Sequence, residues 1–522
     1  MKETLQLRTT PETAATPVKL QVAVSTALGV DVNRIRHIDI LRRSIDARRS
    51  PVMVNLSVTA HLDTYDPADS VRYTPVEYPD VKDARQAIIV GAGPAGLFAA
   101  LELIELGIKP VVLERGKDVD SRRRDQAELC RTGVVDPDSN YCFGEGGAGA
   151  YSDGKLYTRS TKRGPVDKVL RIFHSHGASD DILIDAHPHI GTDRLPVIIK
   201  AMRETIIRQG GEVHFSTRVT GLVTDGPRVT GVTTALCETF SGPVILATGH
   251  SARDVYRMLH DTGIGLEAKG IAVGVRLEHP QEVIDRVQYH SPKGRGQFLP
   301  PAEYSMLTRV DGRAVYSFCM CPGGVIVPAA SAPGEMVVNG MSPSNRGTRW
   351  ANSGMVVEVL PEDVPGDNPL RMMDFQASIE RTFYEVARHT LVAPAQRMTD
   401  FIAGRDSKDL PRSSYAPGIA PGRIDKLLPE PIARRLQTGL TEFGRKARGF
   451  LTDRAVLIGD ETRTSAPVRI PRDKETLSHM VYGGLYPCGE GAGYAGGIVS
   501  AAIDGINCAR ALAAAVSASA EE

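Results

Sequence analysis

The sequence has no excess charge of either sign and few cysteines, and both shortages narrow its class. Lysine plus arginine and aspartate plus glutamate each number 62, so the formal net charge is zero. That balance removes any global electrostatic attraction to nucleic acid or to an acidic membrane. Seven cysteines are too few and too scattered for a disulfide framework, and their number is odd. We therefore expect a reducing compartment and a cytoplasmic protein.

Long uninterrupted apolar runs are also missing. Residues 1–17 are polar and rich in threonine, without the apolar segment of a secretory signal. The two most apolar stretches, 87–108 and 491–515, are interrupted by charged residues, among them Glu102 and Asp504. Neither stretch is expected to span a membrane. Both are better explained as strand–helix units wrapped on a cofactor.

The chain does contain enough material for several domains. It has 522 residues, 42% of them apolar, which corresponds to about two to four domains of ordinary size. The pattern predicts an α/β fold, a Rossmann-type domain that is interrupted by an α+β substrate domain and preceded by a small α+β domain. The expected limits are a flexible tail at 1–17, the small domain at 18–80, the first part of the dinucleotide-binding domain at 84–260, the inserted domain at 261–480 and the closing part at 481–522.

The strongest local signal is a glycine turn between a strand and a helix. Residues 87–90 predict a buried strand, and Gly91, Gly93 and Gly96 follow before a helical run. Gly91 allows the tight bend, Gly93 lets the backbone approach a pyrophosphate, and Gly96 lets helix and strand pack closely. A second strand ends in Glu114, where a carboxylate accepts hydrogen bonds from a ribose 2′-hydroxyl. An ordinary glycine-rich turn is the alternative, and the position of Glu114 argues against it.

A second glycine cluster spans residues 141–156. Its glycines disfavour a regular core helix and offer backbone N–H groups at close range, which suits a flat ring carrying carbonyls or an anion. A flexible surface loop is the alternative. The aromatic residues and the leucine that are interleaved with the glycines favour the binding loop.

Two later segments are expected to meet the first turn. Residues 243–249 predict a buried strand ending in Ala-Thr-Gly, and ligands bind at the carboxyl ends of such parallel strands. Residues 484–500 contain a short strand, a glycine-rich turn and the start of the last helix. That helix start would direct the positive end of its dipole into the turn. Glu490 would offer a carboxylate to sugar-type hydroxyls.

The N-terminal region is locally basic. Residues 34–49 contain six arginines and precede the alternating strand pattern of residues 52–60. A basic hairpin could touch phosphates, whereas the alternative is a solvated strand face partly balanced by Asp39 and Asp46. Residues 73–83, with two prolines and three acidic residues, are expected to be a linker.

Together these segments resemble the flavoproteins of the glutathione-reductase type, which have two dinucleotide-binding domains. More narrowly, the chain resembles the uncharacterised bacterial and plastid FAD-dependent dehydrogenases, NAD(P)/FAD-dependent oxidoreductases that carry a small N-terminal α+β domain. The resemblance covers residues 18–512. It is carried by Ser44–Arg48, Gly144–Leu156, His187–Asp193, Tyr316–Gly324, Glu461–Ile470 and Gly484–Ile498.

The resemblance implies non-covalent FAD in a Rossmann-type FAD-binding domain of the glutathione-reductase type. The first glycine turn would hold the pyrophosphate, Glu114 the adenosine ribose and Glu490 the ribityl chain. The last helix would face the flavin N1/O2 edge, where two-electron reduction leaves negative charge. The implied cofactor-binding residues are Gly91, Gly93, Pro94, Ala95, Gly96, Glu114, Arg115, Gly146, Gly147, Ser152, Val219, Ala247, Thr248, Gly249, Gly489, Glu490, Gly496, Gly497 and Ile498.

The sequence contains fewer signals for the electron donor and acceptor than for the FAD site. No second Gly-x-Gly-x-x-Gly lies between residues 150 and 480, so NAD(P)H is expected to act only as a transient donor at the flavin face. No Cys-x-x-Cys is present either. In a regular strand Cys319 and Cys321 would share one face with their side chains about 7 Å apart, too far for an easy disulfide. Buried packing is expected for this pair, flavin-facing thiol chemistry is the alternative, and no metal site is expected.

The candidates at the substrate end are Arg463, Arg469 and Cys488. The two arginines lie in an irregular segment and could clamp a carboxylate or phosphate, with solvated surface arginines as the alternative. Cys488 lies in the last glycine turn and would be near the cofactor, or would be a small buried residue. His187 and His189 are expected to be structural rather than catalytic bases.

Three functions remain in competition. The first is an oxidoreductase that moves a hydride between flavin N5 and a small organic substrate. The second is an NAD(P)H- and oxygen-using monooxygenase, because residues 455–460 superficially resemble the Gly-Asp flavin motif of those enzymes, although Gly489-Glu490 fits that role better. The third is a flavin-containing modifier or binder of RNA or protein, against which the neutral net charge counts.

Overall fold

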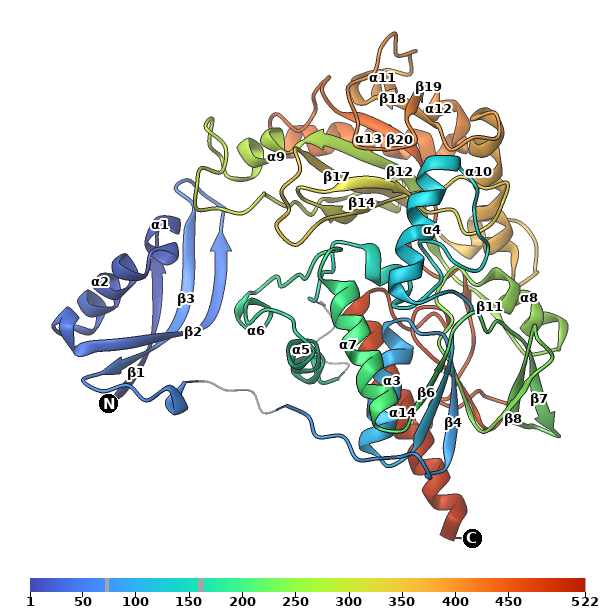
Figure 1. Ribbon diagram of the computed structural model, residues 1–522. Helices are drawn as coiled ribbons and strands as arrows, with labels where there is room; N and C mark the ends of the chain where they lie inside the picture. The colour runs from blue at the N-terminus through green and yellow to red at the C-terminus, as the bar shows by residue number, and fades with distance from the viewer. Residues whose placement is uncertain (71–74, 158–163, 522) are drawn as a thin grey trace.

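The computed structural model describes residues 1–70, 75–157 and 164–521, which form three units (Figure 1). An N-terminal unit is followed by an α/β domain, and this domain is interrupted by an inserted domain built on one large sheet. The chain returns to the α/β domain before it ends, so the two termini lie in different units. Part of the expected linker at 73–83 falls outside the described residues.

The N-terminal unit is a three-stranded antiparallel sheet in the order β1-β3-β2 with two helices against it. The flexible tail predicted at 1–17 is wrong, because β1 pairs with β3 along its whole length. Leu5 and Leu7 alternate along β1 and pack against the core of the unit, which supplies the burial that a tail would lack. Its elements are β1 (Lys2–Thr9), α1 (Pro11–Ala15), α2 (Pro17–Leu28), β2 (Ile35–Asp46) and β3 (Met53–Leu62).

The basic segment 34–49 contains strand β2, and three of its six arginines, Arg34, Arg43 and Arg48, are paired with carboxylates. Arg34 donates to Asp63 at 2.8 Å. Arg43 reaches out of the unit and donates to Asp185 at 2.7 Å, in the α/β domain. This pairing agrees with a balanced, solvated strand face.

The α/β domain is built on a five-stranded parallel sheet in the order β22-β10-β4-β5-β6. The first strand of the domain, β4, is therefore central, and the last strand of the chain, β22, joins the same sheet. A separate antiparallel sheet, β7-β8-β9, flanks it. The strands are β4 (Gln86–Val90), β5 (Lys109–Leu113), β6 (Glu212–His214), β7 (Val219–Asp225), β8 (Arg228–Thr234), β9 (Thr239–Ser241), β10 (Val244–Leu246) and β22 (Leu485–Pro487).

Helices α3, α7 and α14 pack side by side near the sheet (Figure 1). The first and last helices approach closely, because a Cβ at Gly505 would lie 2.1 Å from the carbonyl oxygen of Ala95. The helices of the domain are α3 (Pro94–Glu105), α4 (Val119–Thr132), α5 (Val166–Ser175), α6 (Asp181–Ile184), α7 (Leu195–Arg208), α8 (Arg253–Asp261) and α14 (Ile498–Glu521).

Helix α14 is the one helix among the described residues that is long and apolar enough to cross a bilayer, by length and composition alone. Its apolar window spans residues 498–518, and 61% of that window is buried inside the protein. A core helix of this length satisfies the same criterion. Its contact with α3 accounts for the apolar composition.

The inserted domain contains a seven-stranded sheet in the order β13-β14-β17-β12-β20-β18-β19. Only the β18–β19 pair is parallel. The elements are β12 (Ile271–Pro280), α9 (Gln281–Gln288), β13 (Leu307–Val310), β14 (Arg313–Cys321), β15 (Val325–Pro328), β16 (Val338–Met341), β17 (Trp350–Val359), α10 (Arg371–Val386), β18 (Ala393–Arg397), α11 (Met398–Ile402), β19 (Ile419–Pro421), α12 (Ile424–Leu427), α13 (Glu430–Lys446) and β20 (Val456–Glu461).

The return to the α/β domain comes earlier than residue 481. Val468 and Ile470 are buried in the hydrophobic core of the α/β domain. Strand β21 (Val468–Arg469) pairs with β11 (Glu267–Ala268), so the two connections between the domains run antiparallel to each other. The inserted domain therefore spans about residues 271–464.

Candidate active site

One cavity of about 630 Å³ lies between the α/β domain and the inserted sheet. One side is formed where the parallel strands end, at Val90, Leu113 and Ala247, and the other side by residues 316–320 of β14 and 338–340 of β16. Ligands of open α/β sheets bind at the carboxyl ends of the strands. The volume falls in the range of cofactor and small-molecule sites, roughly 300–1,000 Å³.

The first glycine turn is shaped as the sequence predicts. Gly91 has φ of 105°, and a Cβ there would lie 2.4 Å from the carbonyl oxygen of Ala247, so it both permits the bend and brings the end of β10 close. A Cβ at Gly96 would lie 1.9 Å from the carbonyl oxygen of Gly91. Gly96 therefore serves packing and stands behind the cavity wall, whereas Gly91 and Gly93 line it.

Two helices begin at the cavity. The start of α3 lines it through residues 93–95, and the start of α14 through residues 496–501. The first backbone N–H groups of a helix have no partner within the helix, and the dipole adds positive potential there. The cavity thus offers two separate places that stabilise negative charge, one at each helix start.

Glu114 lines the cavity at the end of β5, but its oxygens are already engaged. One oxygen accepts from the Gly116 and Gly144 N–H groups at 2.9 Å, and the other accepts from the Ala92 N–H at 2.8 Å. A carboxylate has about four acceptor positions, which leaves about one for a ribose hydroxyl. The main effect of Glu114 in this structure is to tie three loops of the cavity together, which sequence spacing alone does not indicate.

Arg115 follows Glu114 in the same wall. It donates to Asp138 at 2.8 Å and to Asp254 at 2.9 Å. Its guanidinium lies 4.1 Å from the centre of the Phe143 ring. Val219 lines the same end of the cavity, so this end offers flat and apolar surface, which suits an adenine.

The second glycine cluster packs against the first. Gly147 lines the cavity, and a Cβ on it would lie 3.3 Å from the Cα of Gly93. Gly146 donates its N–H to the carbonyl of Ala92 at 2.8 Å and lies outside the wall, so its predicted contact with the flavin ring is replaced by a packing role. Ser152 lines the cavity. The two loops form a narrow cradle of backbone, and side chains in place of these glycines would fill the space between the loops.

The last glycine turn completes the wall. Thr248 and Gly249 line it, and a Cβ at Gly491 would lie 2.6 Å from the Gly249 carbonyl oxygen. Gly489 does not line the cavity, and its N–H group donates to Asp504 at 2.7 Å. Glu490 does line it, and burial raises the pKa of its carboxyl to about 7 against the opposing charge of Lys269. Near neutral pH this carboxyl is therefore present in both its protonated and its ionised form, and either form can hydrogen-bond to hydroxyl groups in the cavity.

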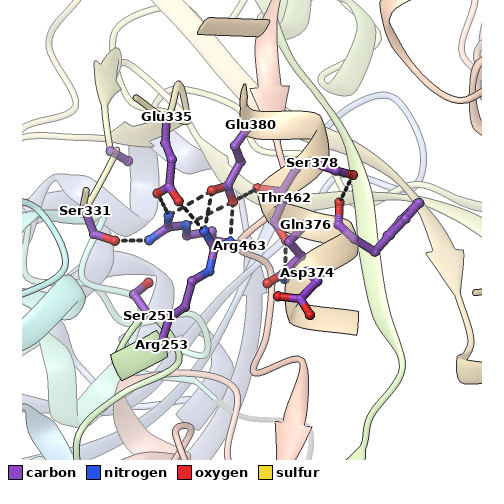
Figure 2. A network of polar contacts seen from close by, with 12 residues as sticks. Ser251, Arg253, Ser331, Glu335, Asp374, Gln376, Ser378, Glu380, Thr462 and Arg463 are labelled. Atoms are coloured by element: carbon purple, nitrogen blue, oxygen red, sulfur yellow. Dashed lines mark hydrogen bonds and ion pairs between the residues drawn. The ribbon is translucent and has the colours of Figure 1, made fainter. Parts of the chain in front are cut away.

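The predicted clamp of Arg463 and Arg469 is wrong. Arg463 lines the cavity, but it donates to Glu380, Glu335 and Ser331 in a buried network (Figure 2). Arg469 lies outside the cavity wall, 3.8 Å from Glu267 on the protein surface. Four of the five N–H groups of Arg463 donate to these partners, and Arg469 points elsewhere, so the pair cannot close on one anion.

Cys488 lines the cavity, as expected, but a hydrogen bond with Cys508 and burial raise the pKa of its thiol. It is therefore a poor nucleophile. Cys488, Asp504 and Cys508 lie close enough together to hold a metal ion. However, Asp504 accepts from Arg472 at 2.6 Å, and Arg472 also contacts the Cys508 sulfur at 3.3 Å, so this guanidinium already supplies the positive charge.

Cys319 and Cys321 do not lie on a regular strand. The pairing of β14 with β17 shifts between Phe318 and Cys321, and Cys319 has φ of 43°. The bulge turns Cys319 into the cavity wall, while Cys321 is fully buried behind it. His187 and His189 lie outside the wall and bond Glu303 and the Ser344 carbonyl, at 2.7 and 3.0 Å, which agrees with their structural interpretation.

Two wall residues were not singled out from sequence. Lys155 ends the second glycine cluster and donates to the carbonyl of Met320 on the opposite domain. His250 directly follows the Ala-Thr-Gly turn, and burial with the charges of Arg463 and Arg253 lowers its pKa to about 4. Their positions beside two glycine motifs were a usable signal, because such motifs place the next side chain at the ligand.

Comparison with known proteins identifies the class. Residues 84–139 match the FAD binding domain, 196–333 the FAD dependent oxidoreductase domain and 270–464 the model described as FAD-dependent protein, C-terminal domain-like. Residues 1–61 match a domain of unknown function. Together with the cradle between two helix starts, these matches define a flavoprotein enzyme, an FAD-dependent oxidoreductase with FAD as its cofactor.

The family follows from one relative. An uncharacterized protein of Clostridium beijerinckii is 39% identical over 517 residues, which cover 94% of this chain and 95% of the relative. The chain belongs to the same family.

Similarity to solved structures is weaker. A geranylgeranyl bacteriochlorophyll reductase-like protein of Thermoplasma acidophilum is 14% identical over 83% of this chain and 80% of that chain, with a TM-score of 0.35. CtdE, solved with FAD and a substrate, is 12% identical over 81% and 78%, with a TM-score of 0.34. The flavin-dependent brominase Bmp2 is 12% identical over 83% and 79%, with a TM-score of 0.37. TM-scores at this level establish no shared activity.

Proposed function

We propose that the protein transfers a hydride between N5 of FAD and a small organic substrate, and so dehydrogenates or reduces a C–C or C–N bond. The observation that carries this is a single cavity that runs between the helix starts of α3 and α14 and is closed by β14 of the inserted domain. When bound, FAD supplies two-electron chemistry at hydride level. The substrate contacts would come from the inserted sheet, which forms the other wall of the cavity.

The residues of the chain have distinct tasks in this proposal. The backbone around Gly93 and the start of α3 would hold the pyrophosphate, and Glu490 would bind the ribityl hydroxyls. The start of α14 would stabilise the negative charge that reduction leaves at the flavin edge. Strand β14 would cover the ring and exclude water, which strengthens electrostatic interactions inside the site.

The arrangement we propose is a FAD domain of the glutathione-reductase type that lacks a nicotinamide domain. In support, the inserted sheet is antiparallel over six of the seven strands that the structure describes, whereas a dinucleotide-binding domain is built on a parallel sheet. NAD(P)H would therefore act transiently, through the same cavity. The substrate would be a small molecule, and we propose no membrane or nucleic-acid partner.

The alternative is an NAD(P)H-dependent flavin monooxygenase. Asp460, which suggested it, lies outside the cavity wall, and both of its carboxylate oxygens are buried without a hydrogen-bond partner among the described residues. It is therefore not placed to bind a flavin. The RNA- or protein-modifying function is disfavoured because half of the arginines of the basic segment are engaged by carboxylates, Arg34 by Asp63 and Arg43 by Asp185 among them.

The test begins with the purified protein, whose released flavin should be FAD at a ratio near one per chain. The flavin is then reduced without oxygen and mixed with fractionated small-molecule extract. Reoxidation by a fraction in the absence of oxygen, with a product that differs by two hydrogens, supports the proposal. Reoxidation only with dioxygen, with labelled oxygen incorporated into the product, would favour the monooxygenase instead.

A further inference from the structure

The bulge in β14 places two thiols next to the cavity in a strained backbone. Cys319 lines the cavity with φ of 43°, which is uncommon for a residue other than glycine. Such strain persists where the surroundings hold it, and it clusters at functional sites. The Cys321 thiol donates to the Cys319 carbonyl at 3.4 Å and lies within hydrogen-bonding reach of the Cys319 sulfur.

Two buried cations hold this bulge. Arg276 donates to the Cys319 carbonyl at 2.7 Å and contacts the Cys321 sulfur at 3.3 Å. Lys155 crosses from the second glycine cluster of the α/β domain and donates to the carbonyl of Met320. Arg276 thus contacts one of the two sulfurs, and Lys155 brings a second cation to the same bulge from the other domain.

The charges differentiate the two thiols. The hydrogen bond with Cys321 lowers the pKa of Cys319, and the charges of Lys155 and Arg276 add to it against burial and the opposing charge of Asp153. The same hydrogen bond and burial raise the pKa of Cys321. A thiolate that faces a cavity and a neutral thiol behind it are the arrangement in which one sulfur attacks and the other completes a disulfide.

The other buried pair lacks these features. Cys488 and Cys508 lie near Arg472, which is paired with Asp504 at 2.6 Å, just as Arg276 is paired with Glu461 at 2.9 Å. The difference is Lys155, which brings a second cation to the bulge of Cys319 and Cys321. The hydrogen bond with Cys508 raises the pKa of Cys488, the thiol that faces the cavity, instead of lowering it. This pair therefore serves as an internal comparison.

We propose that Cys319 and Cys321 are a redox-active dithiol that exchanges two electrons with the FAD of this oxidoreductase. Oxidation breaks the S–H bond of Cys321, uses the Cys319 thiolate and forms one S–S bond. It releases two electrons and one proton, that of Cys321, because Cys319 is already ionised, and oxidised FAD accepts both electrons and the proton. The inference rests on the proposed FAD-dependent function, and it adds a second two-electron store at the substrate side of the cavity.

Electron counting tests the proposal. The holoprotein is oxidised with ferricyanide, desalted and titrated anaerobically with dithionite, and the flavin content is measured in the same sample. Wild-type protein should take up four electrons per FAD, whereas Cys321→Ser should take up two. Cys237→Ser, which removes an exposed thiol, should behave as wild type. A wild-type uptake of two electrons overturns the inference, and a protein that binds no FAD contradicts the proposed function instead.

Peptide mapping gives an independent result that needs no variant. Cleavage after Arg313 and Arg346 releases residues 314–346, which contain both cysteines of the pair and no other. After alkylation of the reduced holoprotein, this peptide should carry two alkyl groups. From the oxidised holoprotein it should carry none, and its mass should be two hydrogens lower than that of the unalkylated reduced peptide. Two alkyl groups in both states contradict the inference. If Cys508→Ser, and not Cys321→Ser, loses the extra electrons, the wrong pair has been assigned.

The role of Lys155 in the pair is measured by alkylation rate. Lys155→Met should shift the pH dependence of iodoacetamide labelling at Cys319 to higher pH, because it removes a charge that favours the thiolate. Lys155→Arg should restore the profile. An unchanged profile in Lys155→Met shows that the cation does not act on the thiol and removes this support for the pair.

Discussion

Arg463 donates to both carboxylate oxygens of Glu380, at 3.1 and 2.9 Å. Glu380 also accepts two hydrogen bonds from Arg253, which lies on α8 of the other domain (Figure 2). Glu380 is fully buried. One carboxylate therefore joins the inserted domain to the α/β domain directly behind the cavity wall.

Replacing Glu380 by glutamine should lower the free energy of unfolding by about 3–5 kcal/mol, because the two buried guanidinium groups would then have to share the Glu335 carboxylate as their counter-charge. Denaturant-induced unfolding measures this. The matched control is Glu282→Gln, which breaks an exposed pair with Arg454 and should cost at most about 1 kcal/mol. Equal effects of the two substitutions would show that the network is not a buried ion cluster.

The same network predicts an acid dependence of stability. Against the effect of burial, Arg463 and Arg253 lower the pKa of Glu380 below its ordinary value of 4.5. The stabilisation is therefore present above that value and is lost as the pH falls through the lowered pKa. Unfolding curves of wild type and Glu380→Gln should converge as the pH is lowered, and a constant difference would contradict this.

Gly96→Ala should destabilise the protein by about 1–3 kcal/mol and weaken FAD binding, because the new methyl group would overlap the Gly91 carbonyl. Thermal unfolding and fluorescence titration with FAD measure the two effects. Gly265→Ala is the control, since nothing lies within 4 Å of its Cβ position. If both variants bind FAD equally well, the turn is more plastic than the structure indicates.

Glu490 should make the stability of the FAD-free protein depend on pH. Burial raises the pKa of its carboxyl from 4.5 to about 7, so the folded state keeps a proton that the unfolded state releases between these values. Stability should therefore fall as the pH rises through this window. Thermal unfolding on both sides of it should show a smaller change in Glu490→Gln than in wild type, and Glu267→Gln serves as an exposed control.

A negative charge at the start of α14 should weaken the cofactor site. Gly497 lines the cavity with open space at its Cβ position. Gly497→Asp should reduce FAD affinity about fivefold, corresponding to about 1 kcal/mol, and should make the flavin potential more negative. Gly497→Ala should change both little. Identical affinities and potentials for the two variants would place the flavin edge away from this helix.

The sequence predicted the cofactor end of the site better than the substrate end. Glycines whose role is steric, such as Gly91 and Gly96, can be interpreted locally because a turn restricts its own backbone. Arg463 could not, because its partners Glu380 and Glu335 lie 83 and 128 residues away in the chain. The bulge at Cys319 is likewise set by packing against β17, which residue alternation does not encode.

The N-terminal strand was missed for a related reason. Residues 1–17 were judged by polarity, yet β1 needs only alternate apolar residues, because one face of its sheet is exposed. Whether this segment is a strand is decided by β3, with which it pairs across separations that run from Thr9–Val54 to Lys2–His61.

The β2–β3 hairpin connects both larger domains. Arg43 bonds Asp185 in the α/β domain, while beyond the end of β2 the Ala47 carbonyl accepts from His290 at 3.0 Å in the inserted domain (Figure 1). Val52 is buried in the core of the inserted domain. The hairpin is thus a brace across the two domains that share the cavity, and its attachment helps to fix how wide that cavity opens.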